Sequence, residues 1–216
     1  MARFHELVSG FHAFRSEYLS RDKAFFQELA RGQSPKTLVV ACCDSRTDPA
    51  IVLGCKPGEL FVVRSIAAIV PDEANAGEHD AVVAALEYGV KHLKIHDIVV
   101  MGHSNCGGIF GLLHPETIAN DRYINRWVSL AGPAVRRIDH ENPQAQGELR
   151  CRLCEEGAVL LSIENLLSYA WIRSAVEAGS LCLHAAYYDL HRGMLALWNS
   201  GTEDYEELAL PAAAAS

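Results

Sequence analysis

The chain of 216 residues carries short runs of consecutive apolar residues that alternate with segments of helical periodicity. The runs at Leu38–Cys42, Leu60–Ala67 and Asp97–Met101 are bounded by polar or turn-forming residues, as is typical of buried parallel strands. Between the last two, Glu78–Leu93 has apolar side chains along one helical side. Strands that alternate with helices predict an α/β fold with a mainly parallel central β-sheet flanked by helices.

The second half of the chain is richer in helical patterns. Helical spacing predicts one helix over Asp121–Ile138 and mostly helix over Glu148–Ala178, with Gly179 as its C-terminal stop. Ser180–Tyr188 alternates in the manner of a strand, and Met194–Trp198 is expected to pair with it as an edge hairpin. We find no internal repeat and no linker that would separate two domains.

The N-terminal segment has an aromatic and aliphatic stripe. Apolar residues recur at helical intervals from Phe4 to Gly32, which predicts one or two amphipathic helices. This stripe could pack on its own domain or on a partner subunit. We therefore expect a single domain over 1–216, with an N-terminal helical arm at 1–34 and a disordered alanine-rich tail at 211–216.

The composition of the chain argues against several classes of protein. The formal charge of −8 argues against a surface for nucleic acid, which needs clustered Lys and Arg. The start lacks the features of a secretory signal, and no apolar run is long enough for a membrane span, so we expect a cytoplasmic protein. Its seven cysteines form an odd number, which in a reducing compartment favours metal binding or catalysis over a disulfide framework.

Two of the predicted strands end in chemically reactive side chains. The first ends at Cys42, and Asp44 and Arg46 follow within four residues, whereas a later strand is followed by His103 and Cys106. A strand that only packed in the core would not need reactive side chains at its end. Reacting groups in open α/β sheets lie beyond the carboxyl ends of the strands, so these side chains are expected to lie together.

The residue types indicate a catalytic zinc site. Zinc prefers thiolate and imidazole ligands, and a catalytic site keeps three protein ligands with a fourth position open. Cys42, His103 and Cys106 meet that count. Asp44 is placed to accept the proton of a water molecule in a hydrogen bond, and Arg46 can hold Asp44 ionised in a charge-assisted pair.

Other interpretations of these residues stay open. Cys42 could be a buried core thiol, and His103 could be a core histidine whose ring nitrogens have hydrogen-bond partners. Cys151 and Cys154 could complete a closed structural metal site, although this spacing in a helix also suits simple packing. The remaining cysteines are expected in the core: Cys43, Cys55 and Cys182.

Two motifs carry a resemblance to a known family: Cys42-x-Asp44-Ser45-Arg46 and His103-x-x-Cys106-Gly107-Gly108. With them, the sequence resembles the β-class carbonic anhydrases from about Lys36 to Trp198, and we expect a catalytic core over 36–198. The resemblance implies a zinc lyase that interconverts carbon dioxide and bicarbonate. It implies that Cys42, His103 and Cys106 bind Zn²⁺, while Asp44 and Arg46 orient a zinc-bound hydroxide for attack on carbon dioxide.

The resemblance also bears on assembly and on the state of the site. It implies a homodimer or a dimer of dimers, in which the N-terminal arm packs on the neighbouring subunit. Some family members have a closed form in which the aspartate corresponding to Asp44 becomes a fourth zinc ligand. That form is often tied to a bicarbonate effector site that uses Trp where this chain has Val39, so we expect the constantly open form.

Two alternative functions fit the same residues. The scaffold could hydrolyse carbonyl sulfide or carbon disulfide, whose attacked carbon is similarly electrophilic. A non-catalytic, zinc-stabilised binding protein is a further alternative. The Asp44–Arg46 pair argues against that one, because a structural site has no use for an oriented hydroxide.

Overall fold

The computed structural model describes residues 2–19 and 22–208, in two compact units with the boundary between Ser34 and Pro35. The first unit is helical, as its periodicity predicts, and comprises α1 (Ala2–Phe14), a π-helical turn η1 (Arg15–Leu19) and α2 (Lys23–Leu29). Large apolar side chains along α1 are exposed by 38% to 71%: Phe4, Leu7, Val8, Phe11 and Phe14. Within this unit the α1 part of the predicted stripe is therefore exposed, whereas Phe25, Phe26 and Leu29 of α2 are half-buried.

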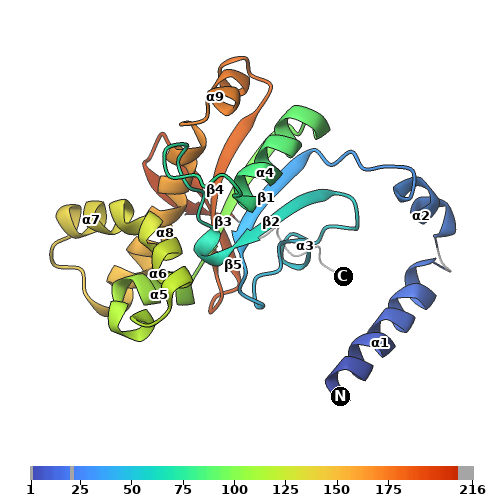
Figure 1. Ribbon diagram of the computed structural model, residues 1–216, viewed down its shortest axis with the longest axis horizontal. Coiled ribbons are helices and arrows are strands. Elements are labelled where there is room, and N and C mark those ends of the chain that lie inside the picture. The colour runs from blue at the N-terminus through green and yellow to red at the C-terminus, as the bar shows by residue number, and fades with distance from the viewer. Residues whose placement is uncertain (1, 20–21, 209–216) are drawn as a thin grey trace, which may run out of the picture. The chain divides into compact units, whose positions relative to one another are not determined.

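The second unit is built on a six-stranded sheet with the order β2-β1-β3-β4-β5-β6 (Figure 1). The strands are β1 (Thr37–Cys42), β2 (Leu60–Ser65), β3 (Asp97–His103), β4 (Cys182–Asp189), β5 (Met194–Asn199) and β6 (Asp204–Glu207). The α-helices are α3 (Pro49–Val52), α4 (Ala81–Tyr88), α5 (Gly107–Leu113), α6 (Arg122–Val128), α7 (Gly132–Glu141), α8 (Gly147–Leu166) and α9 (Ala170–Glu177). Shorter helical turns are η2 (Ile66–Ala68), η3 (Gly89–Leu93), η4 (Pro115–Ile118) and η5 (Ser129–Ala131).

The register of the parallel strands aligns the carboxyl ends of β1 and β3, which carry the predicted metal ligands. β1 pairs in parallel with both β2 and β3, and Ala41 lies opposite Met101. β3 pairs in parallel with β4, whereas β5 and β6 continue the sheet in antiparallel fashion. The predicted mainly parallel sheet and the antiparallel pairing of β4 with β5 are confirmed, but β6 and not β5 is the strand at that edge of the sheet. Because β1 and β3 are adjacent and parallel, Cys42 and His103, the last residues of these strands, lie at the same end of the sheet.

Apolar side chains on one face of the central strands form the main core. Leu38, Val40, Ile98 and Val100 are fully buried there. The sheet is covered by α8, which packs against β3 and β4, and by α4 beside β2 (Figure 1). The residues that end β1 and β3 are thus held by a rigid layer.

Several predicted boundaries are wrong for identifiable reasons. The helix expected over 121–138 is two helices, because Gly132 and Pro133 begin the new helix α7. The second strand ends at Ser65, since Ala67 and Ala68 take left-handed φ values of 59° and 53°. β6 was not predicted, and the tail expected at 211–216 lies outside the described residues.

Candidate metal centre

The structure brings together three predicted ligands from two strands and a loop. Cys42 ends β1, His103 ends β3, and Cys106 immediately precedes α5. All three residues are buried, and their ligand atoms lie within 4.8 Å of one another. Over residues 2–19 and 22–208, no other group of His, Cys, Asp and Glu is arranged closely enough to hold a metal.

His103 presents one ring nitrogen to this group. Its Nδ1 lies 2.9 Å from the carbonyl oxygen of Ser104, a contact that fixes the ring orientation. Its Nε2 is the only buried side-chain nitrogen or oxygen without a hydrogen-bond partner in the part of the chain that the structure describes. A buried polar atom left unpaired is costly, whereas a metal ion would satisfy it. Two thiols and this nitrogen are a donor set that fits zinc.

The two thiols lie in contact with each other. A hydrogen bond from Cys106 lowers the pKa of Cys42 below its usual range, and the same contact, with burial, raises the pKa of Cys106. The backbone N–H of Ala67 also points at the Sγ of Cys42, with the nitrogen 3.3 Å away. The pocket therefore favours thiolate at Cys42, the form that binds metal.

Asp44 and Arg46 form the predicted pair. Nε and the backbone N–H of Arg46 each donate to Oδ1 of Asp44 at 2.9 Å, while Nη2 donates to Oδ2 at 2.7 Å. These bonds hold the pKa of Asp44 well below its usual range. Oδ2 of Asp44 lies 4.0 Å from Nε2 of His103. An ionised acceptor is thus placed beside the three ligands.

Arg64 supports the loop that follows β1, a role that sequence reasoning missed. Its Nε donates to the carbonyl oxygen of Cys42 at 2.8 Å, and its Nη2 donates to that of Asp44 at 2.6 Å. The only sequence signal was a charge near the end of an apolar strand. The left-handed backbone of Ala67, which aims its N–H at Cys42, had no such signal.

The other cysteines lie outside the metal group. Cys154 is fully buried in an apolar cluster on α8, and Cys151 is partly buried, so the closed site that would use them is not formed. The expectation that Cys43 and Cys182 are core residues is wrong, because both side chains are exposed. Cys43 follows the last buried position of β1, and Cys182 opens β4, where the sheet meets solvent.

Gly102 sets how closely β3 approaches α8, and we expect Gly102→Ala to disturb the site. An added Cβ would overlap Cγ2 of the buried Val159, so the strand that carries His103 would have to shift. Overpacking of this kind costs about 1 to 3 kcal/mol in the free energy of unfolding, measured by urea denaturation. Gly107→Ala is the control, because its added Cβ meets nothing within 4 Å; equal losses in the two variants would contradict this account.

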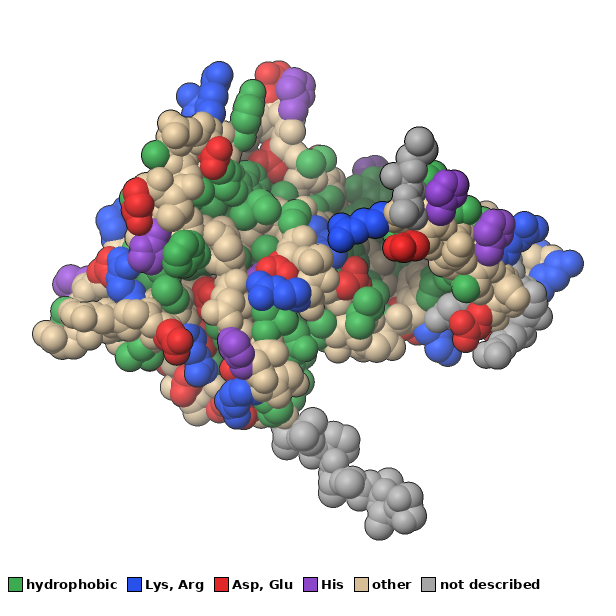
Figure 2. Space-filling model, turned by 90° about the horizontal axis from the view of Figure 1, so that it is seen from below, with side chains coloured by type: hydrophobic (Ala, Val, Ile, Leu, Met, Phe, Trp, Pro, Cys, Tyr) green, Lys and Arg blue, Asp and Glu red, His purple; other side chains and the backbone are tan. Residues whose placement is uncertain are grey.

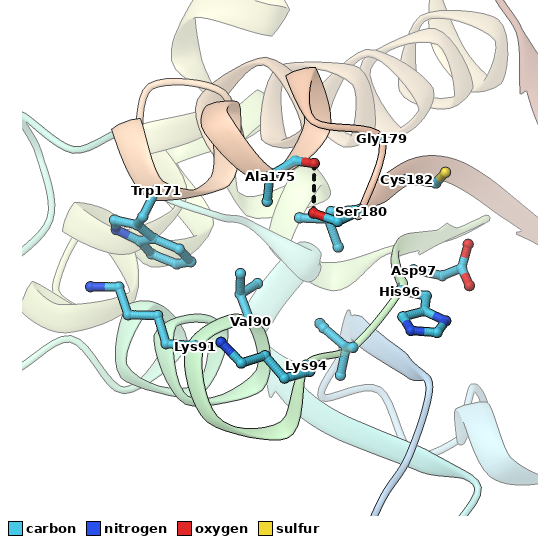
Figure 3. A pocket seen from close by; sticks show the side chains of 12 residues that line it. Val90, Lys91, Lys94, His96, Asp97, Trp171, Ala175, Gly179, Ser180 and Cys182 are labelled. Carbon is cyan, nitrogen blue, oxygen red and sulfur yellow. Dashed lines mark hydrogen bonds between the residues drawn. The ribbon is translucent and has the colours of Figure 1, made fainter.

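A separate cavity of about 560 Å³ lies at the opposite end of β3 and β4 (Figure 3). Lys91, Lys94 and Trp171 line it, and none of the three grouped ligands does. The ammonium group of Lys91 lies over the Trp171 ring, 5.4 Å from its centroid, and also pairs with Glu87. The metal chemistry is therefore separate from this cavity.

One face of the molecule carries charged side chains of both signs. On the face drawn in Figure 2, basic and acidic side chains are interspersed, without an extended area of Lys and Arg alone. Among the helices of the described residues, none is both long and apolar enough to cross a membrane.

Known proteins with a similar sequence belong to one family. The sequence pattern of the carbonic anhydrase family matches residues 37–195. β carbonic anhydrase 3 of Arabidopsis thaliana is 38% identical over 195 residues, which is 89% of this chain and 75% of that protein.

Solved structures of similar proteins agree with this match. The structure of the β-carbonic anhydrase CcaA superposes with a TM-score of 0.90 at 29% identity, covering 97% of this chain and 94% of that one. One of two tetrameric β-carbonic anhydrases from Sordaria macrospora gives a TM-score of 0.78 at 29% identity, covering 99% and 100% of the two chains.

Proposed function

The chain belongs to the β-carbonic anhydrase family, whose zinc enzymes hydrate carbon dioxide reversibly, and we propose how its own residues carry out this reaction. Cys42, His103 and Cys106 hold the Zn²⁺. The observation that supports this assignment most strongly is the unpaired Nε2 of His103, buried beside two cysteines within 4.8 Å. When bound there, Zn²⁺ supplies Lewis acidity that makes a water molecule nucleophilic near neutral pH.

Asp44 and Arg46 orient the reacting water. The two carboxylate oxygens of Asp44 are fixed by Arg46, so Asp44 stays an ionised acceptor and can take a hydrogen bond from the water at Oδ2. A water held in this way turns its lone pair towards the substrate carbon. Because Arg46 holds the carboxylate of Asp44 in place, with Oδ2 4.0 Å from Nε2 of His103, the geometry supports an open site in which Asp44 orients the water and is not a metal ligand.

Apolar side chains on one side of the site suit carbon dioxide. Ala67, Ile69 and Ile109 are buried and pack in one cluster with Cys42 and Cys106. Apolar surroundings of this kind suit an apolar substrate, and Asp44 supplies a polar contact at the site. The relatives named above are carbonic anhydrases, which favours carbon dioxide over carbonyl sulfide or carbon disulfide as substrate.

Removal of the metal tests the zinc assignment. We expect a chelator that strips Zn²⁺ to abolish carbon dioxide hydration, and added Zn²⁺ to restore it, because the three residues alone provide no Lewis acid. Stopped-flow assays with a pH indicator, made alongside zinc analysis, measure both quantities. Hydration that persists in zinc-free protein would contradict the assignment.

We also propose a cytoplasmic homo-oligomer, either a dimer or a dimer of dimers, in which α1 packs on a neighbouring subunit. The exposed side chains of Phe4, Leu7 and Phe11 on α1 support this assembly, because a row of exposed apolar side chains marks an interaction surface. The Sordaria macrospora relatives are tetrameric. Light scattering of the purified chain should give a mass of two or four times 23.6 kDa, and deletion of residues 2–19 should lower it.

A further inference from the structure

Glu155 on α8 is the only buried carboxylate in the described part of the chain, with 6% of its surface exposed. Both of its oxygens are engaged. Oε1 accepts the backbone N–H of Cys106 at 2.8 Å, and Oε2 accepts the hydroxyl of Tyr187 at 2.7 Å. Tyr187 is itself 2% exposed, so the network is closed to solvent.

Neither hydrogen-bond partner of Glu155 carries a positive charge. Burial of a carboxylate without a cation is costly, and an amide side chain of the same shape could meet both partners without that cost. Packing alone therefore does not explain why a charged residue occupies this buried position. A cation bound close to Glu155 would explain it.

The three metal-binding residues provide the place for such a cation. Cys106, whose own N–H is bound by Glu155, is one of the three, and Tyr187 lies opposite Gly102 in the sheet, next to His103. Oε1 of Glu155 is therefore one hydrogen bond away from a metal-binding residue. A divalent ion held by the three ligands would be attracted by the carboxylate charge, and the attraction is strong where water is excluded.

We propose that Glu155 is a positioning residue for the metal: it fixes the Cys106 backbone, and its negative charge strengthens the binding of the divalent cation. Tyr187 orients the carboxylate by donating to Oε2. The inference rests on the proposed zinc site and extends it to a second layer of residues. Groups in this position orient metal ligands, and their loss commonly lowers metal affinity by about 10- to 100-fold.

The test is the zinc affinity of Glu155→Gln, measured by competition with a chromophoric chelator. Gln keeps the size of the side chain and an acceptor for the Cys106 N–H but removes the charge. We expect the dissociation constant for Zn²⁺ to rise about ten-fold, without a fall in the urea midpoint of the metal-free protein. The visible spectrum of the Co²⁺-loaded variant should also change, because Cys106 is held differently.

Glu156→Gln is the matched control. Glu156 is the next residue of α8, with its side chain 14% exposed, but it pairs with Arg152 and not with the metal group. Its zinc affinity should equal that of the wild type. An equal loss of affinity in both variants would mean a general effect of charge on α8 and would overturn the proposal.

Tyr187→Phe provides a second test if Glu155→Gln does not fold. It removes the hydroxyl that orients Oε2 and leaves the charge in place, so a smaller rise in the dissociation constant is expected. Wild-type zinc affinity in either folded variant would overturn the role proposed for the residue replaced. A wild-type protein that binds Zn²⁺ but does not hydrate carbon dioxide would instead contradict the proposed function alone.

Discussion

The Cys42→Ser variant is expected to lose both its zinc and its activity. Serine replaces a thiolate, the preferred zinc donor, with a hydroxyl that stays protonated near neutral pH. Loss of an outer partner of a metal ligand already costs about 10- to 100-fold, so loss of the ligand itself should lower carbon dioxide hydration more than about 100-fold. Zinc content by mass spectrometry and stopped-flow hydration are measured on the same samples.

Cys43→Ser is the control for this variant. Cys43 is the adjacent residue, yet its side chain is exposed and lies outside the group of three. It should keep full zinc content and full activity. Zinc retained at wild-type affinity in Cys42→Ser would contradict the ligand assignment.

The Asp44→Asn variant should separate activity from metal binding. The amide has one oxygen acceptor where the carboxylate has two, and its NH₂ group would face a nitrogen of Arg46 across a hydrogen-bond distance. The water then loses its charged acceptor. Because misplacement of a reacting group can cost about 100-fold, hydration should fall by about 100-fold while zinc content stays unchanged.

Asp97→Asn is the matched control for Asp44→Asn. Asp97 begins β3, at the opposite end of the strand from His103, and pairs with His184. This change should leave hydration within about two-fold of the wild type, as expected for a surface substitution remote from the site. Activity of Asp44→Asn close to that of Asp97→Asn would exclude Asp44 from the reaction.

The elements that position the metal ligands could be predicted from the sequence because their signals are local. Apolar runs that are followed closely by Cys42 and His103 indicate buried strands with reactive ends. The parallel register of β1 and β3 then brings the ligands together without any further sequence signal. This is why the three ligands lie where the strand pattern placed them.

The residues that support the site could not be predicted, because their contacts join distant parts of the chain. Glu155 lies 49 positions beyond Cys106, and nothing in the pattern of α8 distinguishes it from the neighbouring Glu156. The left-handed backbone of Ala67 is set by the packing around it, since alanine has no local preference for that conformation. Tertiary context, not propensity, decides these positions.

The central claim is that this chain, with zinc at the ends of β1 and β3, hydrates carbon dioxide from an open site. Its most direct test is the hydration rate of the zinc-loaded wild-type protein, followed by stopped flow from about pH 6.5 to about pH 9. We predict a rate that rises with pH through a single ionisation. An abrupt onset above about pH 8 would contradict the open site, and no acceleration at any pH with zinc bound would contradict the function itself.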